Sequence, residues 1–211
     1  MRRAVGMAVG VALMVLPVEE VGSPGSPVHG RPRAAAAWAL DQPARGLCGP
    51  TSVAMVVGQL RGRPVGRREA SWTAERMGLL DYPMDRGVVG MRRSSLGDLF
   101  AAFGVPAEPV RTTVNGLRAL LDEGRAIVLH VDSAELWGRG DGEADHFVVL
   151  TGIDDRHEVA RINDPGMGPA YGFAQGTGAA HAISLAALDD AWHDSGRWAV
   201  VTEAAPGLRA A

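Results

Sequence analysis

The segment from Asp41 to Leu60, DQPARGLCGPTSVAMVVGQL, contains the only cysteine of the chain, Cys48. A Gly-Pro pair and an apolar run follow this cysteine, which predicts that it lies at the start of a helix, where Pro is tolerated in the first turn. Free N–H groups and the helix dipole at that end favour a thiolate, the nucleophilic form of cysteine. One cysteine cannot form an internal disulfide, which leaves a free thiol, a metal ligand or a nucleophile. Its position favours the nucleophile over a small buried apolar side chain.

Three other residues could complete thiol chemistry. His146 opens the apolar stretch HFVVLTGID, and Asp164 ends the next stretch, in INDPG. If the two stretches are adjacent antiparallel strands, the carboxylate of Asp164 can fix the tautomer and orientation of the His146 ring. Gln42 lies shortly before Cys48, and its side-chain N–H with the backbone N–H of Cys48 could bind an oxyanion. Together these residues predict acyl transfer through a thioester, with His146 as acid and base.

Other assignments of these residues were weighed. His130 is a rival base, but its place in the middle of the apolar run IVLHVD is more typical of packing. Asn163 is the other candidate to orient His146, yet strand alternation points it to the opposite face from Asp164. A metal site built from these histidines and aspartates lacks a His-x-x-x-His spacing or paired cysteines, so we expect neither metal nor cofactor.

Local patterns predict the elements that must position these residues. Apolar spacing and stop signals predict helices over 50–60, 69–77, 95–104, 113–124 and 184–196, the last with Ser184 as N-cap. Runs of apolar and β-branched residues predict strands over 125–132, 146–154, 157–164 and 197–203. We expect loops over ELWGRGDGEAD and the Gly-rich run 166–178. Helices come first and an antiparallel sheet second, which is the α+β pattern.

The order Q-x5-CGPTS, DHFVVLTGID and INDPG resembles the papain clan of cysteine peptidases. Within that clan the chain is similar to family thirty-nine, named for bacteriocin leader processing, and to its stand-alone bacterial members. The likeness covers residues 38–203 and includes VDSAELWG and SLAALDDAWHDSG. It implies a papain-like fold, in which a helical half carries the nucleophile and packs on an antiparallel, barrel-like sheet. It also implies the roles of the four matching residues: nucleophile Cys48, acid/base His146, orienting Asp164 and oxyanion donor Gln42.

The substrate does not follow from the resemblance. Leader peptidases of this family are usually fused to a transporter that supplies a double-glycine substrate, and the sequence shows neither a membrane domain nor a nucleotide-binding motif. We therefore expect a cysteine peptidase acting on a peptide or protein of open sequence. Two alternatives remain: a non-proteolytic amidase or acyltransferase of the same fold, and an inactive papain-like module that binds peptides.

Composition excludes several classes of function. The formal net charge is −3 at pH 7, so the chain lacks the excess positive charge that is typical of nucleic-acid-binding proteins. All 21 basic residues are Arg, which excludes a lysine Schiff base, a P-loop lysine and a Ser-x-x-Lys acyl enzyme. We expect a monomer without an integral membrane domain.

The first residues resemble an export signal. Two arginines precede an apolar run from Ala4 to Leu16, which is too short to span a bilayer but typical of a signal-peptide core. The small residues Ala34 to Ala37 are a candidate cleavage site. We expect a signal peptide or disordered leader over 1–37, a peptidase domain over 38–203 and a disordered tail over 204–211. The expected location is secreted or exported, with a cytoplasmic location as the alternative.

Overall fold

The computed structural model describes residues 27–81, 90–137, 144–205 and 208. The apolar run of the predicted leader and most of the predicted C-terminal tail lie outside the described residues.

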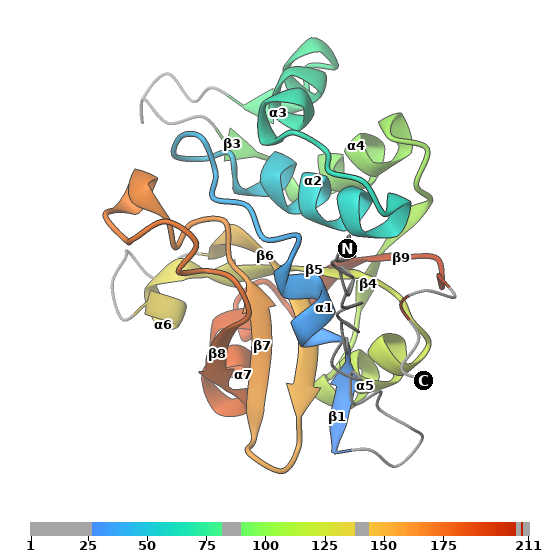
Figure 1. Cartoon of the computed structure of the whole chain (residues 1–211), viewed down its shortest axis with the longest axis vertical. Coiled ribbons are helices and arrows are strands. Elements are labelled where there is room, and N and C mark those ends of the chain that lie inside the picture. Colours follow the sequence, from blue (N-terminus) through green and yellow to red (C-terminus); the bar gives the residue numbers. More distant parts are fainter. Residues whose placement is uncertain (1–26, 82–89, 138–143, 206–207, 209–211) are drawn as a thin grey trace, which may run out of the picture.

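An antiparallel sheet forms the centre of the molecule (Figure 1). In the part of the chain that the structure describes it has seven strands, in the order β4-β9-β5-β6-β7-β8, and β1 also pairs with β6. The strands are β1 (Val28–Gly30), β4 (Ala107–Arg111), β5 (Ile127–Asp132), β6 (Ala144–Asp154), β7 (Val159–Asn163), β8 (His181–Ser184) and β9 (Trp198–Thr202). The four strands predicted from sequence correspond to β5, β6, β7 and β9, and the predicted β6–β7 hairpin is confirmed.

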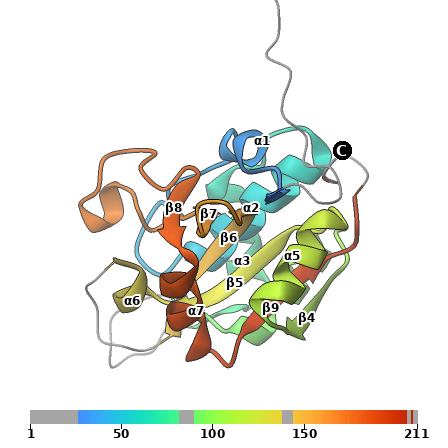
Figure 2. The same ribbon diagram turned by 90° about the horizontal axis from the view of Figure 1, so that it is seen from below.

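Helices cover both faces of this sheet (Figures 1 and 2). Strand alternation produces two cores: Phe147 and Val149 of β6 pack with the α2 side, whereas Val148 and Leu150 pack with the α5 and α7 side. The first face carries α2 (Cys48–Arg61), α3 (Arg67–Arg76) and α4 (Leu96–Ala102). The second carries α5 (Val114–Asp122) and α7 (Leu185–His193).

The smaller elements connect these layers. They are α1 (Pro32–Ala36), α6 (Ser133–Trp137), the 3₁₀ turns η1 (Arg93–Ser95) and η2 (Pro169–Tyr171), and the two-stranded pair β2 (Leu80–Asp81) and β3 (Gly90–Met91). None of the helices in the described ranges is long and apolar enough to cross a membrane.

The predicted helices are confirmed, with small shifts at their ends. Helix α2 begins at Cys48, two residues before the expected start, and ends where Gly62 adopts a left-handed conformation with φ of 63°. Ser184 is the N-cap of α7, and its hydroxyl accepts from the N–H of Ala187 at 3.1 Å. The expected loop over ELWGRGDGEAD instead begins with the end of the short helix α6.

The folded region begins before the expected boundary at residue 38. Val28 pairs with Asp154 and Gly30 with Gly152, so β1 extends the sheet. Residues 28–37 were expected to belong to the leader, but the edge of β6 offers backbone partners that a short strand can use. Ala35 in α1 is buried, and its carbonyl accepts from the amide of Asn163 at 2.8 Å. The candidate cleavage site therefore lies inside the fold.

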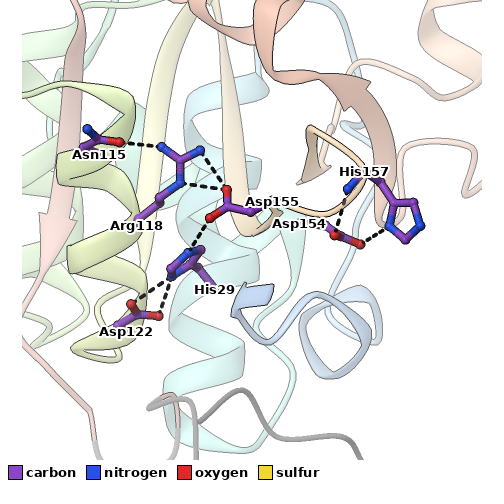
Figure 3. Close-up of polar contacts among 7 residues, drawn as sticks. All are labelled: His29, Asn115, Arg118, Asp122, Asp154, Asp155 and His157. Carbon is purple, nitrogen blue, oxygen red and sulfur yellow. Dashed lines mark hydrogen bonds and ion pairs between the residues drawn. The ribbon is translucent and has the colours of Figure 1, made fainter. Parts of the chain in front are cut away.

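His29 fastens this N-terminal strand to two other elements (Figure 3). Its ring lies between two carboxylates, with Nδ1 at 2.8 Å from Asp122 of α5 and Nε2 at 3.1 Å from Asp155 in the β6–β7 turn. Arg118 of α5 pairs with the other oxygen of Asp155 at 2.7 Å. These four side chains join α5, β1 and the β6–β7 turn.

Candidate active site

Cys48 is the first residue of α2, on the helical side of the sheet. Its side chain is 6% exposed and touches the core beneath the helix. The next residue must be small, because a Cβ on Gly49 would lie 3.1 Å from the sulfur of Met91 and 3.3 Å from the ring of Phe147. Close packing of the helix on β6 thus brings the thiol to the edge of that strand.

His146 and Asp164 meet because β6 and β7 are neighbours in the sheet. His146 Nε2 lies 2.7 Å from Asp164 Oδ1, and both side chains are buried. The same oxygen accepts from the backbone N–H of Gly166 at 2.8 Å, which fixes the turn after β7. The other oxygen, Oδ2, accepts from the indole N–H of Trp137 at 2.9 Å. The carboxylate therefore has three hydrogen-bond donors.

The thiol of Cys48 lies near the same ring. Its interaction with the His146 side chain is among the causes of the raised pKa of that histidine. Because Asp164 takes Nε2, the nitrogen left for the sulfur is Nδ1. The structure therefore brings these three residues, distant along the chain, to one place.

Electrostatics within this group favour the ionised forms. Burial acts to lower the pKa of His146, but the Asp164 carboxylate outweighs it, and the pKa of the ring stands well above its ordinary value of 6.5. Burial acts to raise the pKa of Asp164, but the charge of His146 and the donated hydrogen bonds outweigh it, so this pKa lies below 3.8. An imidazolium next to a carboxylate is thus the stable state of the pair.

Gln42 is held beside the pair by its backbone. Its N–H donates to the carbonyl of Pro165 at 2.9 Å, directly after Asp164 in the chain. The neighbouring Asp41 adds a second tie, because its carboxylate accepts from the N–H of Gly176 at 3.1 Å. The side-chain amide of Gln42 is buried, and neither of its polar atoms has a hydrogen-bond partner among the described residues. A buried amide without partners costs free energy, because its lost hydrogen bonds to water are not replaced.

The rival residues lie outside this group. His130 lies in β5 with its ring 4.8 Å from that of Phe147, and burial, with the charges of Arg93 and His146, lowers its pKa to about 4. Asn163 uses its amide to bind the carbonyl of Ala35 and the N–H of Ala180, so it does not orient His146. No group of three potential ligands in the described ranges is arranged to hold a metal.

Trp137 contacts the site but is not among the residues predicted from the sequence. Its indole N–H donates to Asp164, and its ring lies 5.0 Å from the His146 ring. The only sequence signal was its place in VDSAELWG, directly after a predicted strand. Asp145 and the segment 138–143 lie outside the residues whose side chains are described.

The chain is similar to known proteins in both sequence and structure. Residues 35–177 match the model of the Peptidase_C39 like family. Uncharacterized proteins of Mycobacterium bovis and Mycobacterium tuberculosis are 24% identical over 204 residues, covering 83% of this chain and 84% of theirs.

Three solved structures show a similar fold. A C39-like peptidase from Bacillus anthracis has a TM-score of 0.58 at 16% identity, covering 82% of this chain and 96% of that one. The peptidase domain of Streptococcus ComA, a bi-functional ABC transporter, has a TM-score of 0.53 at 14% identity, covering 78% and 97%. A double glycine motif protease from an AMS/PCAT transporter has a TM-score of 0.50 at 18% identity, covering 83% and 98%. The predicted papain-like α+β fold agrees with these neighbours.

Proposed function

Because this chain belongs to the Peptidase_C39 like family, we propose that it hydrolyses peptide bonds with Cys48 as nucleophile, His146 as acid and base, and Asp164 as the residue that orients the ring. The observation that supports these roles is the buried hydrogen bond between His146 and Asp164, with the thiol of Cys48 interacting with the same ring.

Acylation begins with His146 as an imidazolium and Cys48 as a thiolate, the proton of the thiol resting on Nδ1 of the ring. The sulfur then attacks the carbonyl carbon of the substrate, and the negative charge moves to the carbonyl oxygen. The side-chain N–H of Gln42 and the backbone N–H of Cys48 stabilise this oxyanion, and each donor contributes about 3 kcal/mol in comparable sites. When the tetrahedral intermediate collapses, the imidazolium gives its proton to the leaving amine.

Deacylation reverses the role of the histidine. The neutral His146 removes a proton from water, the hydroxide attacks the thioester carbonyl, and the sulfur leaves as a thiolate beside the restored imidazolium. Asp164 holds Nε2–H throughout, which keeps Nδ1 facing the sulfur and stabilises the imidazolium before acylation and during deacylation.

The proposed substrate is a peptide or protein. One of the structural neighbours is a double glycine motif protease in complex with a leader peptide. At 18% identity this likeness concerns the fold, and the residues that select a sequence are not carried over from it.

A peptide library digested by the purified full-length chain tests the proposal. Mass spectrometry of the products should show cut backbones for the wild type and none for Cys48→Ala, with the same circular dichroism spectrum for both. Full activity in Cys48→Ala would refute the mechanism. Loss of ammonia from glutamine side chains without a cut backbone would show an amidase of the same fold instead.

We further propose that the protein is exported and that its leader is removed before Val28. The leader-like first residues support export, and the pairing of β1 with β6 requires that the strand be retained. N-terminal sequencing of protein recovered from culture medium should give a first residue at or before Val28. A first residue within 34–38 would contradict this boundary, and protein found only inside cells would contradict export.

A further inference from the structure

We propose that Trp137 is a positioning residue for the reaction, which holds the Asp164 carboxylate in the plane that His146 requires. This proposal rests on the proposed function, because it assigns a task to a side chain that acts only through the catalytic pair. Trp137 ends α6, directly beyond β5, and Asp164 directly follows β7. Strand β6, which carries His146, lies between β5 and β7 in the sheet. Three adjacent strands therefore place the Trp137 indole, the His146 ring and the Asp164 carboxylate close together.

The two oxygens of the Asp164 carboxylate accept hydrogen bonds from different donors. Oδ1 receives two hydrogen bonds, from His146 at 2.7 Å and from the N–H of Gly166 at 2.8 Å. Oδ2 receives one from a described residue, the indole N–H of Trp137 at 2.9 Å. Without that donor, Oδ2 would be a buried acceptor with no described partner, and the carboxylate could rotate about its Cβ–Cγ bond and turn Oδ1 away from the ring.

Packing fixes the indole for this task. Its ring meets the His146 ring edge-on, at 5.0 Å between centroids and 62° between planes. A Cβ on Gly166 would lie 2.7 Å from the indole, so the ring rests directly on the backbone of the turn that follows Asp164. On the other side, Tyr171 and Phe173 contact the indole at 5.2 and 5.8 Å between centroids. The donor thus has little freedom to leave the carboxylate.

The hydrogen bond from Trp137 also favours the charged form of Asp164, and it contributes to the low pKa of that carboxyl. Among the described residues, Cys48 of α2 and His130 of β5 also interact electrostatically with His146, and Arg93 of η1 interacts with His130. Loss of the indole N–H should let the carboxylate take a proton at higher pH, because a donor to the ionised form is removed. The imidazolium would then lose its partner earlier as the pH falls.

Trp137→Phe tests the proposal, since it keeps an aromatic ring and removes the N–H. The first readout is the rate of alkylation of Cys48 by iodoacetamide against pH in the full-length chain, where one cysteine makes the signal unambiguous. We expect the low-pH limb of the profile to move up by about one pH unit. On a peptide found in the library screen, kcat should fall about tenfold with KM unchanged, because the loss lies in proton transfer.

Trp192→Phe is the matched control. The indole N–H of Trp192 is also buried and bonded, to the carbonyl of Trp198 at 2.7 Å, so the same chemical change is made away from the site. This variant should keep the alkylation profile of the wild type. An equal shift in both variants would mean that loss of a buried indole N–H acts through general loosening, and would overturn the proposal.

A double-mutant cycle separates positioning from a structural role. In an Asp164→Ala background, Trp137→Phe should change the alkylation rate and kcat less than twofold, because the carboxylate it acts through is gone. The same tenfold loss in both backgrounds would overturn the proposal. If the proposed function itself is wrong, Cys48 in His146→Ala should be alkylated at the rate of the wild type. If only the role of Trp137 is wrong, the alkylation rate should be low in His146→Ala and equal to that of the wild type in Trp137→Phe.

Discussion

The two halves of the site differ in how well their polar groups are paired. On the sheet, the Asp164 carboxylate accepts from three donors, one of which is Nε2 of His146. On the α2 side, the buried amide of Gln42 has no described partner for its nitrogen or its oxygen. The first half therefore stabilises the folded state, whereas the unpaired amide of the second costs stability, and under the proposed mechanism it gains a partner in the oxyanion.

The largest expected effect comes from breaking the sheet-borne half. Asp164→Asn should lower kcat by about 10³- to 10⁴-fold, because the ring loses the tautomer and the charge that its role requires. Measured on the same peptide, a loss of less than tenfold would show that the carboxylate does not orient the ring.

The loss of stability in Asp164→Asn should also depend on pH. The raised pKa of His146 contributes stability that is fully present below pH 6.5 and is lost as the pH rises through the pKa of the folded state. The lowered pKa of Asp164 contributes stability that is present above pH 3.8 and is lost as the pH falls through the pKa of the folded state. Urea titrations should therefore find the greatest stability advantage of wild type over Asp164→Asn between pH 3.8 and 6.5. A constant difference across that range and into alkali would contradict the ion pair.

A smaller effect on rate, with the opposite sign in stability, is expected on the α2 side. Gln42→Met keeps a similar volume and removes the unpaired amide, so kcat should fall about 10²-fold while the free energy of unfolding rises by about 1 kcal/mol. Denaturant curves and kinetics on one preparation test both halves of this statement. A variant that loses stability would show that the amide has a structural partner and that the contrast between the halves is false.

The smallest effect should come from outside the site. His29→Gln weakens the tie between β1, α5 and the β6–β7 turn, and because both carboxylates are partly exposed we expect a loss of about 0.5–1 kcal/mol in unfolding free energy. The value of kcat should stay within twofold of the wild type. A large fall in kcat at unchanged stability would link the N-terminal strand to the reaction, and the comparison would then have to include a third region.

The elements missed by sequence share a physical reason. Strand β4 contains Pro109 and mostly exposed or half-buried residues, so no buried alternation marks it. Strand β1 has three residues in a Gly/Pro-rich segment, and it is a strand because β6 offers it backbone partners. In contrast, β5, β6 and β9 are long apolar runs whose own composition predicts them.

The site shows the same division. Cys48, His146 and Asp164 could be predicted because each lies at the end of an element that local pattern reveals. The tie between Gln42 and the turn after Asp164 could not, since it depends on a hydrogen bond between backbones that are distant along the chain. The role of Trp137 depends likewise on how α6 meets the β7 turn in three dimensions.

Acylation of Cys48 by a small activated ester tests directly whether His146 activates the thiol. The chain has one cysteine and no lysine, so p-nitrophenyl acetate offers an acetyl group to few competing nucleophiles. Peptide mapping by mass spectrometry should find one acetyl on the segment that contains Cys48, formed and lost again in the wild type and formed about 10²-fold more slowly in His146→Ala. Acetylation elsewhere, or equal rates in the two proteins, would contradict a thiol activated by its histidine.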